Sequence, residues 1–405
     1  MISVEEARRR ILDAFRPLPA ETVSIAEALG RVLAEDVRAR LTQPWAAVSA
    51  MDGYAVRGAD VAAAGAVLHE IAQVPAGASF DGTVGPGECV RIFTGAPLPA
   101  GTDTIVIQED TVRDGSRITV AEATAEGTYV RPAGLDFAEG QVLLEAGRPL
   151  TARDVGLAAA MNVPWVRVRR RPRIAILATG DEIVLPGDPV GANQIVSSNG
   201  PALAALVTAC GGLPLNLGIA RDDRESLSAM AANAHGADLL ITTGGASVGE
   251  HDLIRDVLGD MGLELDFWKI AMRPGKPLMF GRIGDTPLLG LPGNPVSSMV
   301  CALLFGRPIL QRLLGLPTEA DGPPDTAVLG RALPPNDRRQ DYLRSRLSRG
   351  ADGRPVATPF DRQDSSMMSY LAHADCLVVR PPHAPAAAKG ETVAIVRFEA
   401  GLIAL

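Results

Sequence analysis

Residues 173–182, RIAILATGDE, join a run of apolar residues to a polar loop that contains glycine. The same arrangement returns at 238–252, DLLITTGGASVGEHD, and at 286–298, TPLLGLPGNPVSS. Further apolar runs, LPLNLGI, LDFWKIA and PLMFG, lie between them, and most of the runs are separated by stretches with helical periodicity. Those helical stretches are expected at 199–210, 223–235, 251–261 and 295–312. The alternation predicts an α/β domain over 173–317, a doubly wound and mostly parallel sheet with helices on both faces.

The segments on either side of this domain have other patterns. Ser3 and Glu6 form a capping-box pattern at the start of an amphipathic helix, and a second such signal follows within 24–30. Residues 44–150 are rich in Gly, Pro, Val and Thr and contain short alternating runs. They predict a β-rich module. The tail over 318–405 again has short strand-like runs with Pro and Gly, which predict a small β domain.

The composition excludes several classes of protein. The chain of 405 residues is 47% hydrophobic and 21% charged, which fits a folded, multidomain protein and not a disordered chain. Lys and Arg number 39 against 47 Asp and Glu, so binding of nucleic acid over a broad face is not expected. No apolar run reaches about 18 residues, so no membrane span is expected, and the charged N-terminus is unlike a signal peptide. Four isolated cysteines predict reduced thiols in a cytoplasmic protein.

Four polar loops mark the candidate site. In a doubly wound sheet, ligands bind beyond the carboxyl ends of the strands, where these loops are expected. Two of them open helices, whose backbone N–H groups favour anions, and another supplies Arg273 and Lys276. The acids Glu182, Asp222 and Asp252 could hold a divalent metal ion. The loops span 178–182, 242–252, 273–277 and 291–298.

Several of these residues also have a simpler interpretation. Asp52-Gly53 in SAMDGYA is a common turn dipeptide, and its spacing alone favours a turn. Asp222 is equally suited to cap the following helix, and Ser297 could bond only to the first turn of its own helix. Asn294 fits an N-cap position, with Pro295 after it. Because the chain lacks a Walker lysine motif and a G-x-G-x-x-G, we expect phosphates and Mg²⁺ but neither a P-loop nucleotide nor a Rossmann dinucleotide.

Six motifs resemble one known family, the MoeA family, and they occur in the order typical of its members. The resemblance covers nearly the whole chain. The motifs are SAMDGYA (49–55), RIFTGAPLPAGTDTIV (91–106), ILATGDE (176–182), ITTGGASVGEHD (241–252), FWKIAMRPGKPLMFG (267–281) and LPGNPVSS (291–298).

The resemblance implies a function in molybdenum-cofactor synthesis. Members of the family insert molybdate into adenylylated molybdopterin and release AMP in a Mg²⁺-dependent reaction. They are homodimers in which the SAMDGYA aspartate of one chain faces the doubly wound domain of the other. Further partners would be the molybdopterin adenylyltransferase and other cofactor-synthesis proteins. The implied domains are 1–43 with 151–172 (helical, discontinuous), 44–150 (inserted, β-rich), 173–317 (molybdopterin-binding) and 318–405 (C-terminal β).

The resemblance also assigns roles to residues of this sequence. Acids matched to the reaction are Asp52, Asp136, Glu182, Asp222 and Asp252, of which the last three are the expected metal ligands. Substrate contacts are expected at Thr94, Thr179, Gly180, Gly244, Gly245, Ser247, Gly249, Pro292, Gly293, Asn294 and Pro295. Molybdate, a tetrahedral dianion, is expected at Arg273, Lys276, Ser297, Arg344 and Ser365.

The sequence departs from the family pattern at two places. Leu135 stands where an acid often precedes Asp136, and residues 364–367 read DSSM where many bacterial relatives have Gly-Ser-His. Three other functions stay open at this stage: a molybdopterin adenylyltransferase, a non-catalytic scaffold like the gephyrin relative, and a sugar- or nucleotide-binding protein. A stand-alone molybdopterin adenylyltransferase lacks the long modules that flank the doubly wound domain here. The presence of Asp52, Glu182, Asp222 and Asp252 together argues against a non-catalytic scaffold. The sequence does not distinguish molybdate from tungstate.

Overall fold

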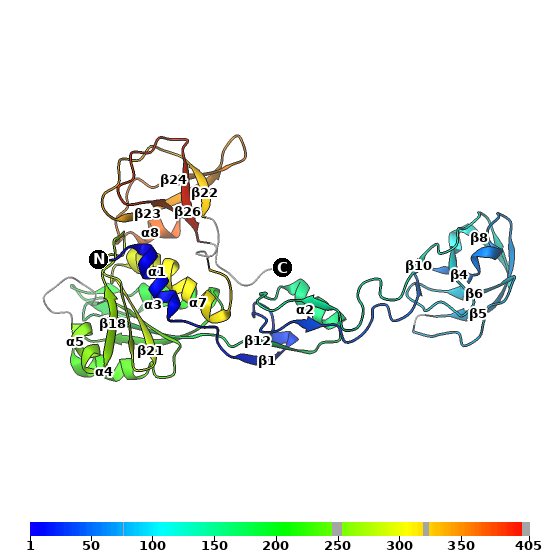
Figure 1. The fold of residues 1–405 in the computed structure, drawn as a ribbon, viewed down its shortest axis with the longest axis horizontal. Coiled ribbons are helices and arrows are strands. Elements are labelled where there is room, and N and C mark those ends of the chain that lie inside the picture. Colours follow the sequence, from blue (N-terminus) through cyan, green and yellow to red (C-terminus); the bar gives the residue numbers. More distant parts are fainter. Residues whose placement is uncertain (76, 245–252, 319–323, 399–405) are drawn as a thin grey trace. The chain divides into compact units, whose positions relative to one another are not determined.

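The computed structural model describes residues 1–75, 77–244, 253–318 and 324–398 (Figure 1). The chain divides into two compact units. The larger unit consists of Met1–Glu35, Ala146–Arg153 and Arg167–Leu405, and the smaller of Asp36–Glu145 and Asp154–Val166. Among the described residues, none of the helices combines the length and the apolar character needed to cross a bilayer.

A six-stranded mixed sheet forms the centre of the larger unit, in the order β16-β13-β17-β21-β20-β18. The first four strands are parallel, as the sequence predicts, whereas β20 pairs antiparallel with both β21 and β18. Only Gly284 and Asp285 connect β20 to β21, and so short a connection leaves no room for a crossover helix. The strands are β13 (Arg173–Thr179), β16 (Leu213–Ala220), β17 (Leu239–Thr243), β18 (Leu263–Trp268), β20 (Met279–Ile283) and β21 (Thr286–Leu291).

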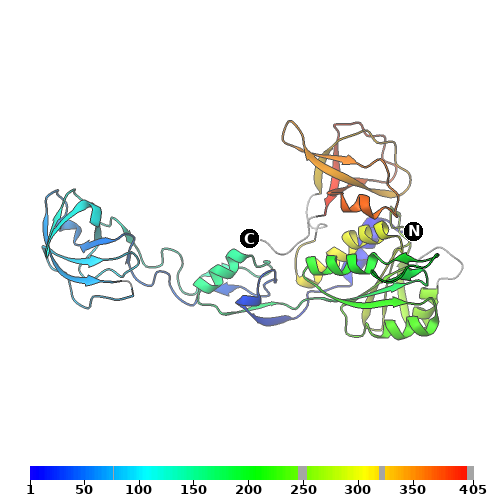
Figure 2. The same ribbon diagram turned by 180° about the vertical axis from the view of Figure 1, so that it is seen from behind.

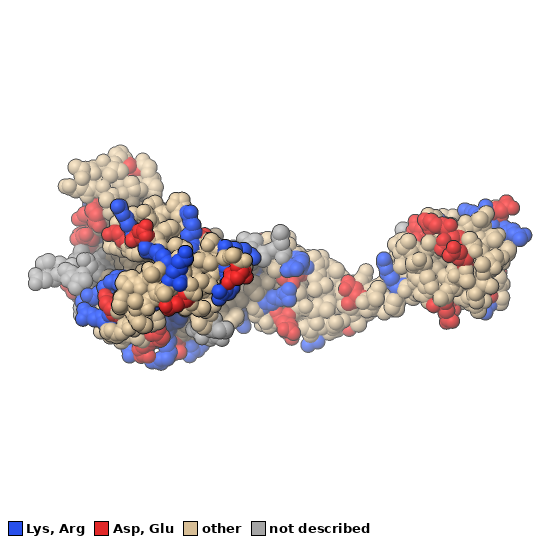
Figure 3. All heavy atoms as spheres, turned by 90° about the horizontal axis from the view of Figure 1, so that it is seen from above, with Lys and Arg blue, Asp and Glu red and all other residues tan. Residues whose placement is uncertain are grey.

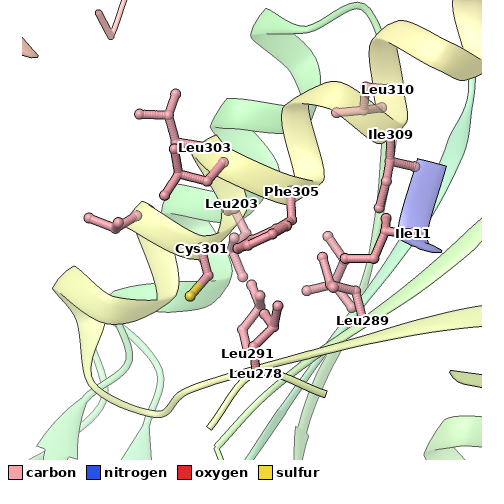
Figure 4. Packing of buried hydrophobic residues seen from close by; sticks show 14 of the residues in the cluster. Ile11, Leu203, Leu278, Leu289, Leu291, Cys301, Leu303, Phe305, Ile309 and Leu310 are labelled. Atoms are coloured by element: carbon pink, nitrogen blue, oxygen red, sulfur yellow. The ribbon is translucent and has the colours of Figure 1, made fainter. Parts of the chain in front are cut away.

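Helices cover both faces of this sheet, which confirms the doubly wound arrangement. Along β13, Ile174 and Ile176 face one core with α1, α3, α6 and α7, while Ala175 and Leu177 face another with α4 and α5. Seen from behind, α3 and the α6–α7 region lie together on one face (Figure 2). Figure 4 shows Phe305 and neighbouring leucines packed over that face. The helices are α3 (Asn199–Ala209), α4 (Arg224–Ala232), α5 (Leu253–Asp260), α6 (Pro295–Cys301) and α7 (Arg307–Leu314), with a π-helix at Ala302–Gly306.

The predicted N-terminal helical region is only partly helical. Helix α1 (Val4–Asp13) begins at Ser3, whose hydroxyl accepts a hydrogen bond from the Glu6 N–H at 3.1 Å, as the capping box predicts. Its buried face belongs to the core of the sheet domain. The second signal gives one 3-10 turn, Ile25–Glu27, because the chain turns at Gly30 with φ of 71°. The flanking residues form two strands that pair with each other, β1 (Ala20–Ser24) and β12 (Trp165–Arg169).

The smaller unit is built around a six-stranded β-sheet in the order β7-β4-β6-β5-β9-β8. Alternate residues of β4 face opposite sides: Tyr54 and Val56 enter one apolar cluster and Ala55 another. This sheet confirms the β-rich prediction, and helix α2 (Ala152–Ala160) lies mostly in the same unit. The strands are β4 (Gly53–Val56), β5 (Val67–Val74), β6 (Glu88–Ile92), β7 (Thr104–Ile107), β8 (Thr111–Asp114) and β9 (Arg117–Val120).

The predicted C-terminal β domain is a five-stranded barrel, because β23 pairs with both β24 and β25. A short strand of the sheet domain, β19 (Met272–Arg273), pairs in parallel with β23 and so joins the two domains. A single short helix, α8 (Met368–Ala372), precedes β25. The barrel strands are β22 (Asp325–Leu329), β23 (Gln340–Arg349), β24 (Pro355–Pro359), β25 (Cys376–Arg380) and β26 (Thr392–Arg397).

Candidate functional site

The carboxyl ends of four parallel strands meet at one edge of the sheet. In the register, Thr179 lies opposite Ala220, and Thr243 lies opposite both Ala178 and Leu291. The loops after β13, β16, β17 and β21 therefore start side by side, as the sequence predicts for an α/β sheet.

Glycine lets these loops approach each other closely. A Cβ atom on Gly244 would lie 2.4 Å from the carbonyl oxygen of Thr179, and Gly244 has φ of 103°, which disfavours any other residue. On Gly293 a Cβ atom would lie 3.5 Å from the Gly244 Cα atom. The loops at Gly244 and Gly293 therefore lie backbone to backbone, an arrangement that can present N–H groups to an anion.

Asn199 links two of these loops, and the sequence analysis did not single it out. The residue is 8% exposed, and its side-chain amide nitrogen donates to the Thr243 hydroxyl at 2.6 Å and to the Gly293 carbonyl at 2.7 Å. An asparagine at the start of a predicted helix is a signal that the sequence offers. The sequence does not reveal the hydrogen-bond partners of this asparagine, because they lie far away along the chain.

Several buried polar atoms at the same edge have no hydrogen-bond partner within the described part of the chain. They include the hydroxyls of Thr179, Thr242 and Ser298 and the amide oxygen of Asn199. Buried polar atoms are almost always paired, so these four, which lie near the strand ends and the start of α6, indicate a region suited to a polar ligand.

A cluster of acids follows β13 and β16. The Asp222 N–H donates to a carboxylate oxygen of Asp181 at 3.2 Å. Burial raises the pKa of Asp222, and the nearby charges of Asp181 and Glu182 raise it further. Asp223, not Asp222, caps α4, because its carboxylate accepts from the Ser226 N–H at 2.7 Å. The capping interpretation of Asp222 is therefore wrong.

The expected metal ligands are only partly described. No group of three His, Cys, Asp or Glu residues within the described ranges is close enough to hold a metal ion. Asp252 lies outside those ranges, as do the expected substrate contacts Gly245, Ser247 and Gly249.

The two cations at the end of β19 and in the loop after it, Arg273 and Lys276, have different surroundings. Arg273 forms ion pairs with Asp341 and, at 3.4 Å, with Asp337, and the hydrogen bond to Asp341 raises the pKa of the guanidinium. The side chain of Lys276 has no acidic partner among the described residues. Ser297 is buried at the start of α6. Lys276 is thus the more available charge for a bound anion.

The tail of the chain reaches the loop after β21. The Asn294 amide donates to the Ser365 hydroxyl at 2.9 Å, and the Val296 N–H donates to the Ser365 carbonyl at 3.1 Å. Asn294 occupies the N-cap position and Pro295 follows it, as expected, but the Asn294 side chain makes no capping bond to α6. The amide instead attaches the tail serine to the site.

Arg344 forms hydrogen bonds with residues of the same tail segment. It is 1% exposed, and its guanidinium donates to the Gln363 side-chain oxygen at 3.2 Å and to the Met367 carbonyl at 3.4 Å. Burial lowers the pKa of Arg344, and the charge of Asp364 opposes that shift. Arg344 therefore holds the segment that carries Ser365.

Asp52 and Thr94 interact within the smaller unit. The Thr94 N–H and hydroxyl both donate to one Asp52 carboxylate oxygen, at 2.8 and 2.7 Å, and these bonds lower the pKa of Asp52. The interpretation of Asp52-Gly53 as a plain turn is wrong. Gly53 begins β4, where a Cβ atom would lie 2.0 Å from the Val106 carbonyl oxygen. Asp136 is exposed, and its backbone N–H donates to the Gln43 carbonyl at 3.0 Å.

Charges of both signs are mixed on the surface. On the face shown in Figure 3, Lys and Arg alternate with Asp and Glu. On this one face, the described residues form no broad area of Lys and Arg alone.

Three regions of the chain match known families. Residues 2–162 match the MoeA N-terminal region (domain I and II), and residues 175–312 match a probable molybdopterin binding domain. Residues 326–398 match the MoeA C-terminal region (domain IV).

Whole-chain relatives agree with these matches. A molybdopterin molybdenumtransferase of Haemophilus influenzae is 33% identical over 98% of this chain and 99% of its own length. One from a Nostoc species is 40% identical over 73% of this chain and 70% of its own. The crystal structure of a molybdopterin biosynthesis MoeA protein from Pyrococcus horikosii is similar with a TM-score of 0.85 and 32% identity, over 98% of this chain and 99% of that one. The chain therefore belongs to the MoeA family of molybdopterin molybdenumtransferases.

Proposed function

We propose that this enzyme of molybdenum-cofactor biosynthesis inserts molybdate into adenylylated molybdopterin and releases AMP. The observation that carries the proposal is the edge where the glycine loops at Gly244 and Gly293 lie beside the acids around Asp222. Closely spaced backbones with free N–H groups suit phosphates, and carboxylates suit a divalent cation. A substrate with a phosphoanhydride bond needs both.

Mg²⁺ is the proposed cofactor, held by Glu182 and Asp222 together with Asp252. Their carboxylate oxygens are the ligands that Mg²⁺ prefers. The raised pKa of Asp222 reflects burial and the repulsion of neighbouring acids, which a bound cation would relieve. When bound, the ion would neutralise charge on the phosphoanhydride.

The remaining proposed contacts divide between the two ligands. The loops after β17 and β21, at Gly244 and Gly293, would bind the substrate phosphates through backbone N–H groups. Thr179, Gly180, Pro292, Asn294 and Pro295 would line the same site. Lys276, Ser297 and Ser365 would bind molybdate, because a dianion favours cations and hydroxyl donors. Arg273 would share its charge between the anion and Asp341, and Arg344 would hold Ser365 in place.

The chain is proposed to act as a homodimer. Asp52, held by Thr94, is ionised above its lowered pKa and would complete the site of a second copy, and Asp136 would assist it. Association with the molybdopterin adenylyltransferase and a cytoplasmic location are also predictions, the latter resting on four unpaired cysteines. The four domain ranges expected from the sequence are likewise proposed.

The test measures AMP released from adenylylated molybdopterin with and without molybdate and Mg²⁺. Adjacent acids provide a matched pair: Asp222→Asn should abolish release, whereas Asp223→Asn should retain it, because asparagine caps a helix as well as aspartate. Equal activity of the two variants would refute the acid cluster as the reaction centre.

The same assay distinguishes the alternative functions. Synthesis of adenylylated molybdopterin from ATP and molybdopterin would identify an adenylyltransferase. Absence of both reactions in a folded dimer would identify a scaffold.

A further inference from the structure

A cavity of about 700 Å³ lies on the C-terminal barrel, formed by β23, β24, the segment 360–361 and α8. It shares no residue with the candidate site. We propose that it binds a phosphomonoester that also carries an aromatic ring, as a nucleoside monophosphate does. The proposal is independent of the proposed function.

One side of the cavity supplies positive charge and hydroxyls. Arg346 and Ser348 alternate along β23 and so project to one face, and Thr358 lies opposite Arg346 in the register. Arg346 is exposed and has no acidic partner among the described residues. Ser369 and His373 line the other wall four residues apart, a spacing that places two side chains on the same side of a helical turn. These donors suit a phosphate group.

The acid in the lining does not oppose an anion. Asp361 pairs with Arg331 at 2.7 Å, and the same guanidinium donates to the Phe360 carbonyl at 2.7 Å. Arg331 thereby neutralises Asp361 and fastens the wall segment. The charge of Arg346 is left for a ligand.

The wall opposite the strands supplies an aromatic surface. The rings of Phe360 and Tyr370 both line the cavity and pack edge to face, with centroids 5.3 Å apart and planes at 84°. Such a pair holds both rings in place, and aromatic side chains stack well on nucleobases. A cavity of this volume can accept a phosphate and a ring together.

The experiment maps protection of His373 from diethyl pyrocarbonate by mass spectrometry of the full chain. AMP at millimolar concentration should protect His373 but not the exposed His235, which lies outside the cavity. Ribose 5-phosphate and inorganic phosphate should protect His373 much less, because they lack an aromatic ring. Protection by phosphate equal to that by AMP would overturn the role of the ring, and no protection by any of them would overturn the site.

A matched pair of arginine variants tests the phosphate contact. Losing one charged hydrogen bond should raise the AMP concentration for half-protection of His373 about ten- to a hundredfold in Arg346→Ala. Arg354→Ala removes an exposed arginine of the same barrel outside the cavity and should leave it unchanged. Equal effects of the two variants, with circular dichroism unchanged, would also overturn the site.

Discussion

Replacing Asn199 with alanine should loosen the candidate site. The substitution removes two hydrogen bonds, to the Thr243 hydroxyl at 2.6 Å and to the Gly293 carbonyl at 2.7 Å. Thr243 is 1% exposed, so its hydroxyl would lose its partner without gaining water, at a cost of about 1–3 kcal/mol. Gly293 is exposed, so water can replace that bond and the loss is only about 0.5–1.5 kcal/mol. Together, the two losses should lower the free energy of opening of this region by about 1.5–4.5 kcal/mol.

Hydrogen exchange measures this effect locally. Peptides covering β17 and the loop after β21 should exchange faster in Asn199→Ala, while barrel peptides should be unchanged. Asn233→Ala is the control, because its amide makes one exposed bond of 3.3 Å to the Ala229 carbonyl, and such surface changes stay within about 0.5 kcal/mol. AMP release should fall in Asn199→Ala only. Equal protection of the site peptides in the two variants would refute the assigned role of Asn199.

Three further outcomes are expected. Lys276→Ala should raise the molybdate requirement about ten- to a hundredfold and leave pterin binding unchanged; a shift in pterin affinity alone would make Lys276 a phosphate contact. Thr94→Val should raise the pKa of Asp52 toward its ordinary value. The acidic side of the pH–activity profile, where Asp52 titrates, should therefore move to higher pH; an unchanged pH–activity profile would contradict the contact. Asp222→Asn should raise the melting temperature at pH 7, because a carboxyl whose pKa is raised in the folded state destabilises the protein as the pH rises through that pKa. Mg²⁺ should raise the melting temperature of the wild type more than that of this variant, and an equal increase in both would contradict the metal site.

The sheet and the edge at which its polar loops meet could be predicted because they follow from local periodicity. Apolar runs ending in glycine loops give both the strand positions and the end at which a ligand binds. The reversal of β20 could be read only from the two residues, Gly284 and Asp285, that connect it to β21. A short connection is a weak signal unless both strand ends are already known.

Individual roles at the site depended on contacts that the sequence does not contain. Asp222 and Asp223 are adjacent acids, and only the backbone decides which one caps α4 and which one joins the acid cluster. The Asn199 amide contacts residues 44 and 94 positions away. Gly53 looks like a turn glycine but is required by the close approach of Val106 in the sheet. Each of these roles is determined by tertiary contacts.

Strand β19 has a consequence for how this chain can be divided by recombination. Met272 and Arg273 belong to the sheet domain in sequence but pair with Gln340 and Asp341 of the barrel strand β23. A fragment without the barrel would leave Arg273 without both of its carboxylates. It would also lose the serine that Asn294 holds. A gene rearrangement between these two domains would therefore remove part of the proposed anion site, so the barrel and the sheet domain should be inherited together.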